Sequence, residues 1–203
     1  MELGIVIILS AVIMADSQRM NQEIYNDLKI KNVTNVPHIS LFQGRFPEKN
    51  QAQLEQAVAA IAHETAPFKI EMENNLIKAS ENIFWLTKSN DSLIKLHQKI
   101  LAEIPRYTDG LLMQQVIDMP PSSLTAQQKQ KIKKYGIYWV EENFLPHITI
   151  FYSSYDHPKI PAVLAQVKPS LQNAEFTVTK IAIARLGYVG NVESILQEYR
   201  LAF

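Results

Sequence analysis

Six residues near the start of this chain, Pro37–Phe42, recur almost unchanged as Pro146–Phe151. The two copies read PHISLF and PHITIF, so proline, histidine, the first isoleucine and phenylalanine are identical, and serine is exchanged for threonine. Both copies alternate polar and apolar residues with a period of two, which is typical of a half-buried β-strand. The repeat therefore predicts two related halves, each with one strand that carries the same polar face.

Each polar face combines an imidazole with a hydroxyl, because residues two apart lie on the same side of a strand. The pairs are His38 with Ser40, and His147 with Thr149. Histidine can give and take a proton near neutral pH, and cleavage of a phosphodiester needs both actions on opposite sides of phosphorus. We predict that the two faces meet across one cleft. There the histidines would act as general acid and base, and the hydroxyls would bind non-bridging phosphate oxygens.

The last residue of each copy is a phenylalanine, four positions after the histidine. Regular alternation places Phe42 and Phe151 on the same faces as the histidines, roughly 13 Å further along the strands. From there the rings could stack on a nucleobase, or they could fill the core at the strand ends. The sequence leaves both interpretations open.

The composition and the absence of other motifs exclude several other kinds of catalytic and binding site. The chain of 203 residues has no cysteine, which excludes thiolate nucleophiles, disulfides and cysteine-type zinc sites. Its formal net charge is zero, so the sequence does not indicate a broad surface for polyanions. The other histidines, His63, His97 and His157, form no familiar metal motif, and no glycine-rich phosphate loop is present. We expect no metal and no cofactor.

The apolar start of the chain could be mistaken for a signal peptide. Glu2 stands where a signal peptide carries positive charge, and the apolar run is too short to cross a membrane as a helix. We predict a buried strand at Ile5–Met14, a cytoplasmic protein and no membrane partner.

Periodicity and capping residues predict further elements along the chain. Helices are expected from Asp16 or Ser17 to Leu28, over 51–63, from Asn90 or Asp91 to Pro105, and from Pro158 or Pro161 to Val167. Strands are expected over 36–42, 68–72, 76–80, 83–87, 144–152, 176–186 and 195–201, with a polar turn at 32–35 and a hairpin turn at Asn74-Asn75. This order suggests an α+β fold with antiparallel or mixed sheets flanked by helices.

Residues 106–135 fit this scheme least well. Thr125 and Gln128 have the form of a capping box for a short lysine-rich helix, which Gly136 would end. The helix could present a solvated face, or it could form a basic flap over the cleft. Residues 137–140 could be a strand or the arm that leads to the second motif.

The two motifs, His38-Ile39-Ser40-Leu41 and His147-Ile148-Thr149-Ile150, resemble those of the 2H phosphoesterase superfamily. That superfamily includes 2′-5′ RNA ligase-like proteins and cyclic nucleotide phosphodiesterases. The resemblance implies two α+β lobes related by a pseudo-twofold, with the motif strands lining a central groove. It also implies that the two histidines are the acid/base pair and that the serine and threonine hold the phosphate.

RNA ligase-like members often carry a basic residue just after the second motif, where this chain has Phe151 and Tyr152. Arg45, after the first motif, could supply that charge or be solvated. With the neutral net charge, the difference favours a small substrate such as a nucleotide or cyclic phosphate.

We therefore predict that residues 1–203 form a single bilobal domain with metal-independent phosphoesterase activity. The substrate would be a nucleotide or RNA end with a 2′,3′-cyclic phosphate or a 2′-5′ linkage, and the same groups could support reversible 2′-5′ RNA ligation. No obligate protein partner is expected. The alternative is a non-catalytic module that binds nucleotides or RNA in the same groove.

Overall fold

The computed structural model describes residues 1–30, 35–79, 81–152 and 157–202. Its strands are β1 (Glu2–Ile8), β2 (His38–Arg45), β3 (Phe68–Ala79), β4 (Asn82–Thr87), β5 (His147–Tyr152), β6 (Glu175–Val178), β7 (Lys180–Leu186) and β8 (Val192–Arg200). Its α-helices are α1 (Ala11–Leu28), α2 (Gln51–His63), α3 (Asp91–Glu103), α4 (Gln114–Ile117), α5 (Ala126–Tyr135) and α6 (Ile160–Gln166).

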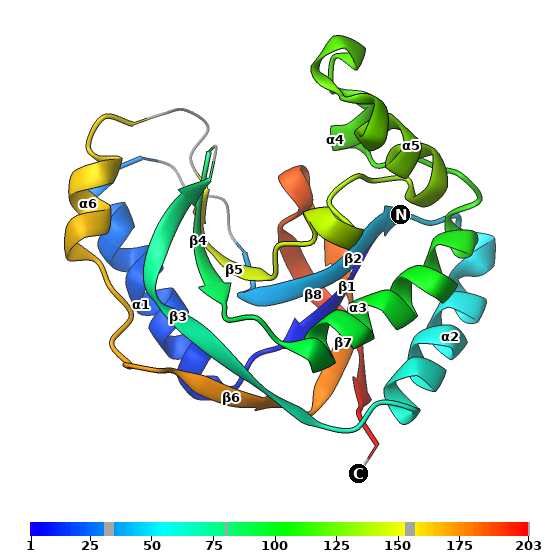
Figure 1. Cartoon of the computed structure of the whole chain (residues 1–203), viewed down its shortest axis with the longest axis horizontal. Coiled ribbons are helices and arrows are strands. Elements are labelled where there is room, and N and C mark those ends of the chain that lie inside the picture. Colours follow the sequence, from blue (N-terminus) through cyan, green and yellow to red (C-terminus); the bar gives the residue numbers. More distant parts are fainter. Residues whose placement is uncertain (31–34, 80, 153–156, 203) are drawn as a thin grey trace.

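The two motif strands lie next to each other in the middle of one curled, eight-stranded sheet. Its order is β6-β3-β4-β5-β2-β1-β7-β8, and neighbouring strands are antiparallel throughout. In Figure 1, α1 and α6 flank the arm formed by β3, β4 and β5, while α2 and α3 flank the arm that contains β2, β1, β7 and β8. The α+β architecture expected from the sequence is therefore confirmed.

The two halves are related by a pseudo-twofold and exchange strands. β1 flanks β2 as β4 flanks β5, and β7 and β3 occupy the next places outward. However, β3 follows β2 in sequence and pairs with β4, while β7 follows β5 and pairs with β1. The helices are exchanged as well, because α1 packs against β5 and α3 against β2. Each half is thus completed by segments from the other.

The apolar N-terminus divides into a strand and a helix, so the prediction of one strand over Ile5–Met14 is wrong. β1 ends at Ile8, and α1 begins after Ser10, whose side chain accepts a hydrogen bond from the Ile13 amide at 3.4 Å. A serine cap stabilises a helix start by satisfying an unpaired backbone N–H. The cap predicted at residue 16 or 17 therefore lies within the helix. In the described parts of the chain, no helix is both long and apolar enough to span a bilayer.

One break predicted between strands is absent, and one break that the structure contains was not predicted. Asn74-Asn75 is no hairpin turn, because β3 runs through it with a shift of register against β4 between Met72 and Leu76. Conversely, the strand predicted over 176–186 is divided at Thr179 into β6 and β7, which pair with strands in opposite arms of the sheet. Alternation alone cannot reveal these divisions, because it does not identify the partner strand. Ser80, the last residue of the strand predicted over 76–80, lies outside the described residues. So do residues 32–34 of the predicted turn.

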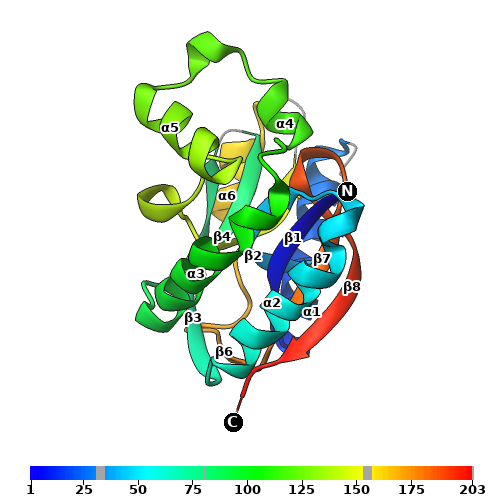
Figure 2. The same ribbon diagram turned by 90° about the vertical axis from the view of Figure 1, so that its right-hand side faces the viewer.

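The remaining local signals give elements near their predicted positions. α2 has the predicted bounds, and α5 carries the predicted capping box between Thr125 and Gln128. Gly136 ends α5 with a φ of 79°, in the left-handed region that favours glycine. Residues 137–140 form a connecting arm and no strand. α4 and α5 lie together at one end of the molecule (Figure 1 and Figure 2).

Candidate active site

The register of the two motif strands is set by the pairing of Ile39 with Ile148. This is the single backbone pairing between β2 and β5 in the described part of the chain. In an antiparallel pair this register places His38 opposite Thr149 and Ser40 opposite His147. Directly opposite side chains have Cβ atoms about 4.5–5.5 Å apart in a regular pair, and diagonal neighbours are about 7–8 Å apart. The structure therefore brings the four predicted polar residues onto one face, and all four line the same cleft.

Both histidines are held in the same tautomer by a carbonyl two residues earlier. His38 Nδ1 is 2.7 Å from the Val36 carbonyl oxygen, and His147 Nδ1 is 2.6 Å from that of Leu145. A carbonyl oxygen can only accept, so each Nδ1 donates and each Nε2 is the basic nitrogen. His38 Nε2 lies 3.1 Å from Ser40 Oγ, on the hydroxyl side of the motif. Nε2 is thus the nitrogen of each ring that can accept a proton.

Burial keeps both imidazoles neutral in the free protein. Burial, together with a smaller effect of the nearby His147 and against the opposing effect of the bond to the Val36 carbonyl, lowers the pKa of His38 to about 4. Burial also lowers the pKa of His147 to about 4. The His147 ring stacks on Phe84, with ring centroids 3.6 Å apart. An anion bound between the imidazoles would favour their protonated forms, so a phosphate could restore one acid to the pair.

The cleft has a volume of about 810 Å³ and a polar wall built of uncharged groups. Among the described residues that line it, none is Lys, Arg, Asp or Glu, and Arg45 is exposed elsewhere. The amide side chains that line it are Gln18, Asn21, Gln22, Asn35, Gln43, Asn82, Gln115, Asn143 and Asn191. The sequence analysis did not identify this wall, because its members are scattered over distant segments without a shared spacing.

The first motif strand contains a β-bulge directly after its hydroxyl residue. Val6 of β1 lies opposite Ser40, whereas the preceding residue, Ile5, lies opposite Phe42. Leu41 is therefore an extra residue in β2, and a bulge of this kind bends the strand and changes which side chains share a face.

The second motif strand contains the same irregularity at the equivalent place. Phe84 of β4 lies opposite Thr149, and Ile83 lies opposite Phe151. Ile150 is the extra residue here. The repeat thus extends from the residue types to the backbone geometry of both strands.

The bulges turn the two phenylalanines into the core. Phe42 and Phe151 are 2% and 1% exposed, and the Phe42 ring packs edge-on against Phe46. Gln43 continues the polar face instead, and its Nε2 donates to Ser40 Oγ at 3.2 Å. The expectation that both rings share a face with the histidines is wrong. Both residues are among those that line the cleft, but the burial of their rings favours the core-filling interpretation over stacking on a nucleobase.

Comparison with known proteins is consistent with these features. A family model described as the 2′-5′ RNA ligase superfamily matches residues 23–187. No curated protein sequence matches the chain.

Within the described residues, no cluster of three or more His, Asp or Glu side chains is placed to bind a metal ion.

Solved structures share the fold at low sequence identity. The crystal structure of TT0787 of Thermus thermophilus aligns with a TM-score of 0.65 and 18% identity, covering 99% of this chain and 98% of that one. A structure described as a phosphoesterase aligns with a TM-score of 0.59 and 14% identity, covering 100% and 98%. E. coli LigT complexed with NADP+ aligns with a TM-score of 0.58 and 12% identity, again covering 100% and 98%. Other crystals of LigT contain 3′-AMP or ATP.

Proposed function

The chain belongs to the 2′-5′ RNA ligase superfamily, and from this premise we propose that it is a metal-independent phosphoesterase. The proposed substrate is a nucleotide or RNA end that carries a 2′,3′-cyclic phosphate or a 2′-5′ linkage. The observation that carries the proposal is the matched pair His38 and His147, which lie on facing strands of one cleft with the same tautomer.

The proposed reaction divides the proton transfers between the two imidazoles. On a 2′,3′-cyclic phosphate, a neutral imidazole takes a proton at Nε2 from the attacking water as the new P–O bond forms. The other imidazole, protonated at the start, gives its Nε2 proton to the ribose oxygen as the old P–O bond breaks. In-line attack requires the two groups on opposite sides of phosphorus. Attack by a 5′-hydroxyl in place of water, with the P–O3′ bond breaking and the 3′-oxygen taking the proton, would form a 2′-5′ linkage, and the reverse step would cleave it.

The hydroxyls of Ser40 and Thr149 are proposed to hold the non-bridging oxygens. Donors placed where negative charge develops stabilise a transition state. In the free protein Ser40 Oγ accepts from Gln43 and donates to the unprotonated His38 Nε2, so the oxygen is held in place and only its O–H has to turn towards the phosphate. The Ser-to-Thr exchange between the motifs keeps the hydroxyl that this role requires.

The uncharged wall of the cleft favours a substrate with few phosphates. Binding of a polyanion depends on several Lys or Arg contacts, whereas amides and aromatic rings suit a base and a ribose. Nucleotides are bound in the crystals of E. coli LigT, and we extend nucleotide binding to this chain as part of the proposal. We also propose that residues 1–203 act as one bilobal domain, because both halves supply strands to the same sheet and residues to the same cleft.

The test is turnover of a substrate panel in the presence of EDTA. The panel contains the four 2′,3′-cyclic nucleotides, 2′-5′ dinucleotides and short RNA with a cyclic phosphate end, and phosphorus NMR identifies the products. Hydrolysis that EDTA does not reduce supports the proposal. Binding without turnover across the whole panel would overturn it and would favour the non-catalytic module.

A further inference from the structure

The carbonyl of each bulge residue accepts a side-chain hydrogen bond from a helix. His97 on α3 lies with Nδ1 2.8 Å from the Leu41 carbonyl oxygen. At the equivalent place, Asn21 on α1 donates from Nδ2 to the Ile150 carbonyl oxygen at 2.6 Å. A bulge residue is left out of the regular ladder, so its carbonyl needs another donor. In both motif strands, a side-chain δ-nitrogen therefore donates to the backbone carbonyl of the residue that directly follows the hydroxyl residue.

His97 also contacts the wall of the cleft. Its Nε2 lies 3.3 Å from the Glu141 backbone nitrogen, and its ring stacks on Phe144 at 3.7 Å with an angle of 6° between the planes. Nδ1 faces a carbonyl and Nε2 faces an N–H, so the contacts assign a neutral ring that donates from Nδ1 and accepts at Nε2. With 2% of its surface exposed, His97 is enclosed between these two partners.

His97 contacts the segment between α5 and β5, which we call the rim segment and define as residues 137–145. It leads from α5 into β5, and Tyr138, Trp139 and Asn143 are among its residues that line the cleft. The backbone turns sharply at Glu141, where φ is 56°. His97 is thus bonded to the middle of the segment that shapes one side of the cleft.

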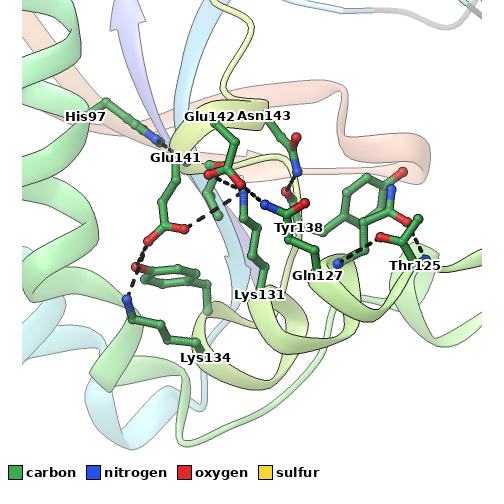
Figure 3. Close-up of polar contacts among 12 residues, drawn as sticks. His97, Thr125, Gln127, Lys131, Lys134, Tyr138, Glu141, Glu142 and Asn143 are labelled. Carbon is green, nitrogen blue, oxygen red and sulfur yellow. Dashed lines mark hydrogen bonds and ion pairs between the residues drawn. The ribbon is translucent and has the colours of Figure 1, made fainter.

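Helix α5 fixes the rim segment from outside (Figure 3). Lys131 is only 5% exposed, and its ammonium donates to the Val140 carbonyl at 3.1 Å and pairs with Glu142 at 2.6 Å. Tyr135 donates to the Glu141 carboxylate at 2.5 Å. The lysine-rich helix is therefore not simply a solvated face, and no described residue of α5 lines the cleft as a flap would. The rim segment is fastened on two sides, by α5 and by His97.

We propose that His97 is a positioning residue that joins the first motif to the rim segment and so aligns the catalytic and substrate-binding parts of the cleft. Its Nδ1–H holds the bulge that orients Ser40 and Gln43, and its Nε2 holds the rim segment at Glu141. The proposal rests on the phosphoesterase function proposed above. Asn21 shows that a δ-nitrogen alone suffices for the bulge contact, whereas histidine at position 97 adds an ε-nitrogen for the rim.

Two substitutions separate these contacts. His97→Asn keeps an N–H at the δ position and removes the ε acceptor, while His97→Gln removes the δ donor and keeps a polar atom at the ε position. For His97→Asn we expect kcat within about threefold of wild type and a KM raised roughly 3–10-fold, the effect of one hydrogen bond. For His97→Gln we expect kcat to fall about 10–100-fold, because a small misplacement of reacting groups is costly.

The matched control is His63→Gln, at an exposed histidine of α2 that does not line the cleft. It should leave kcat, KM and the melting temperature unchanged. Equal loss of kcat in both His97 variants, or wild-type kcat in His97→Gln, would overturn the proposal and leave His97 a packing residue.

A second readout separates this proposal from the proposed function. Nitrogen NMR of the imidazoles reports the His38 ring directly and needs no turnover. We expect His97→Gln, and not His97→Asn, to shift the His38 Nε2 signal. If the wild-type protein cleaves nothing in the panel, the proposed function fails, and an unmoved His38 signal in His97→Gln would then overturn the positioning role separately.

Discussion

Ile39 of β2 lies opposite Ile148 of β5, and this pairing alone aligns the two motif strands within the described residues. Both side chains are fully buried, so the core side of the sheet is continuous where the two halves meet. On the other side of the same pairing are the two histidines and the two hydroxyl residues. The site is thus built on the junction between the halves, and neither half contains it alone.

Removal of either motif hydroxyl should slow the chemical step. We expect Ser40→Ala and Thr149→Val each to lower kcat about 10²-fold, the scale seen when one preorganised oxyanion donor is lost. Thr149→Ser keeps the hydroxyl and should stay within a few-fold of wild type. Steady-state kinetics on a 2′,3′-cyclic nucleotide checks this. Equal activity of Thr149→Val and Thr149→Ser would show that the hydroxyl does not contact the phosphate.

The phenylalanines of the motifs should affect stability and not substrate binding. Phe151 is 1% exposed, so Phe151→Leu should reduce the free energy of unfolding by about 1–3 kcal/mol through lost packing. Its KM should remain within about twofold of wild type. Urea unfolding and kinetics on the same preparation measure both. A large rise in KM without loss of stability would indicate that the ring contacts the substrate.

The rate should fall with rising pH for both the free and the bound enzyme, but the fall should begin at a higher pH for the bound enzyme. Burial lowers the pKa of His38 and His147 to about 4, so the form with one protonated imidazole becomes scarcer as pH rises above that value. We expect kcat/KM, which reports the free enzyme, to fall with increasing pH above about 5. A bound phosphate anion raises the pKa of the acid, so the alkaline limb of kcat should lie at higher pH. A kcat/KM that rises through pH 7 would contradict the assignment.

The same histidines should make the fold sensitive to acid. Between pH 4 and pH 6.5 the unfolded chain binds protons that the buried His38 and the half-buried His147 of the folded protein do not, so the free energy of unfolding rises with pH in this window. The stabilisation is complete above pH 6.5 and is lost as pH falls towards 4. Each histidine contributes a slope of at most about 1.4 kcal/mol per pH unit. Urea unfolding of wild type and His38→Gln should show a shallower slope in the variant.

The sequence predicts those elements whose position depends on residues close together in the chain. The motif strands follow from alternation, α2 from helical periodicity, and the ends of α5 from its capping box and Gly136. The site residues could be selected because a histidine and a hydroxyl recur together in the same context.

The features that could not be predicted from the sequence depend on contacts between segments that are far apart in the chain. The bulges at Leu41 and Ile150 are visible only in the register against β1 and β4. The division at Thr179 follows from the choice of partner strands, which alternation does not encode. The role of Lys131 depends on Glu142, which reaches it from a separate turn after the helix. In each of these cases tertiary pairing decides the structure.

The most direct test of the central claim is hydrolysis of a 2′,3′-cyclic nucleotide by wild type, His38→Ala and His147→Ala in EDTA. Each variant should lose at least about 10³-fold in kcat, because each removes one of two proton-transfer groups. Each should also keep a cooperative melt and binding of 3′-AMP, which show that the cleft is intact. Wild-type turnover in either folded variant would contradict the assignment of the two histidines as the acid/base pair.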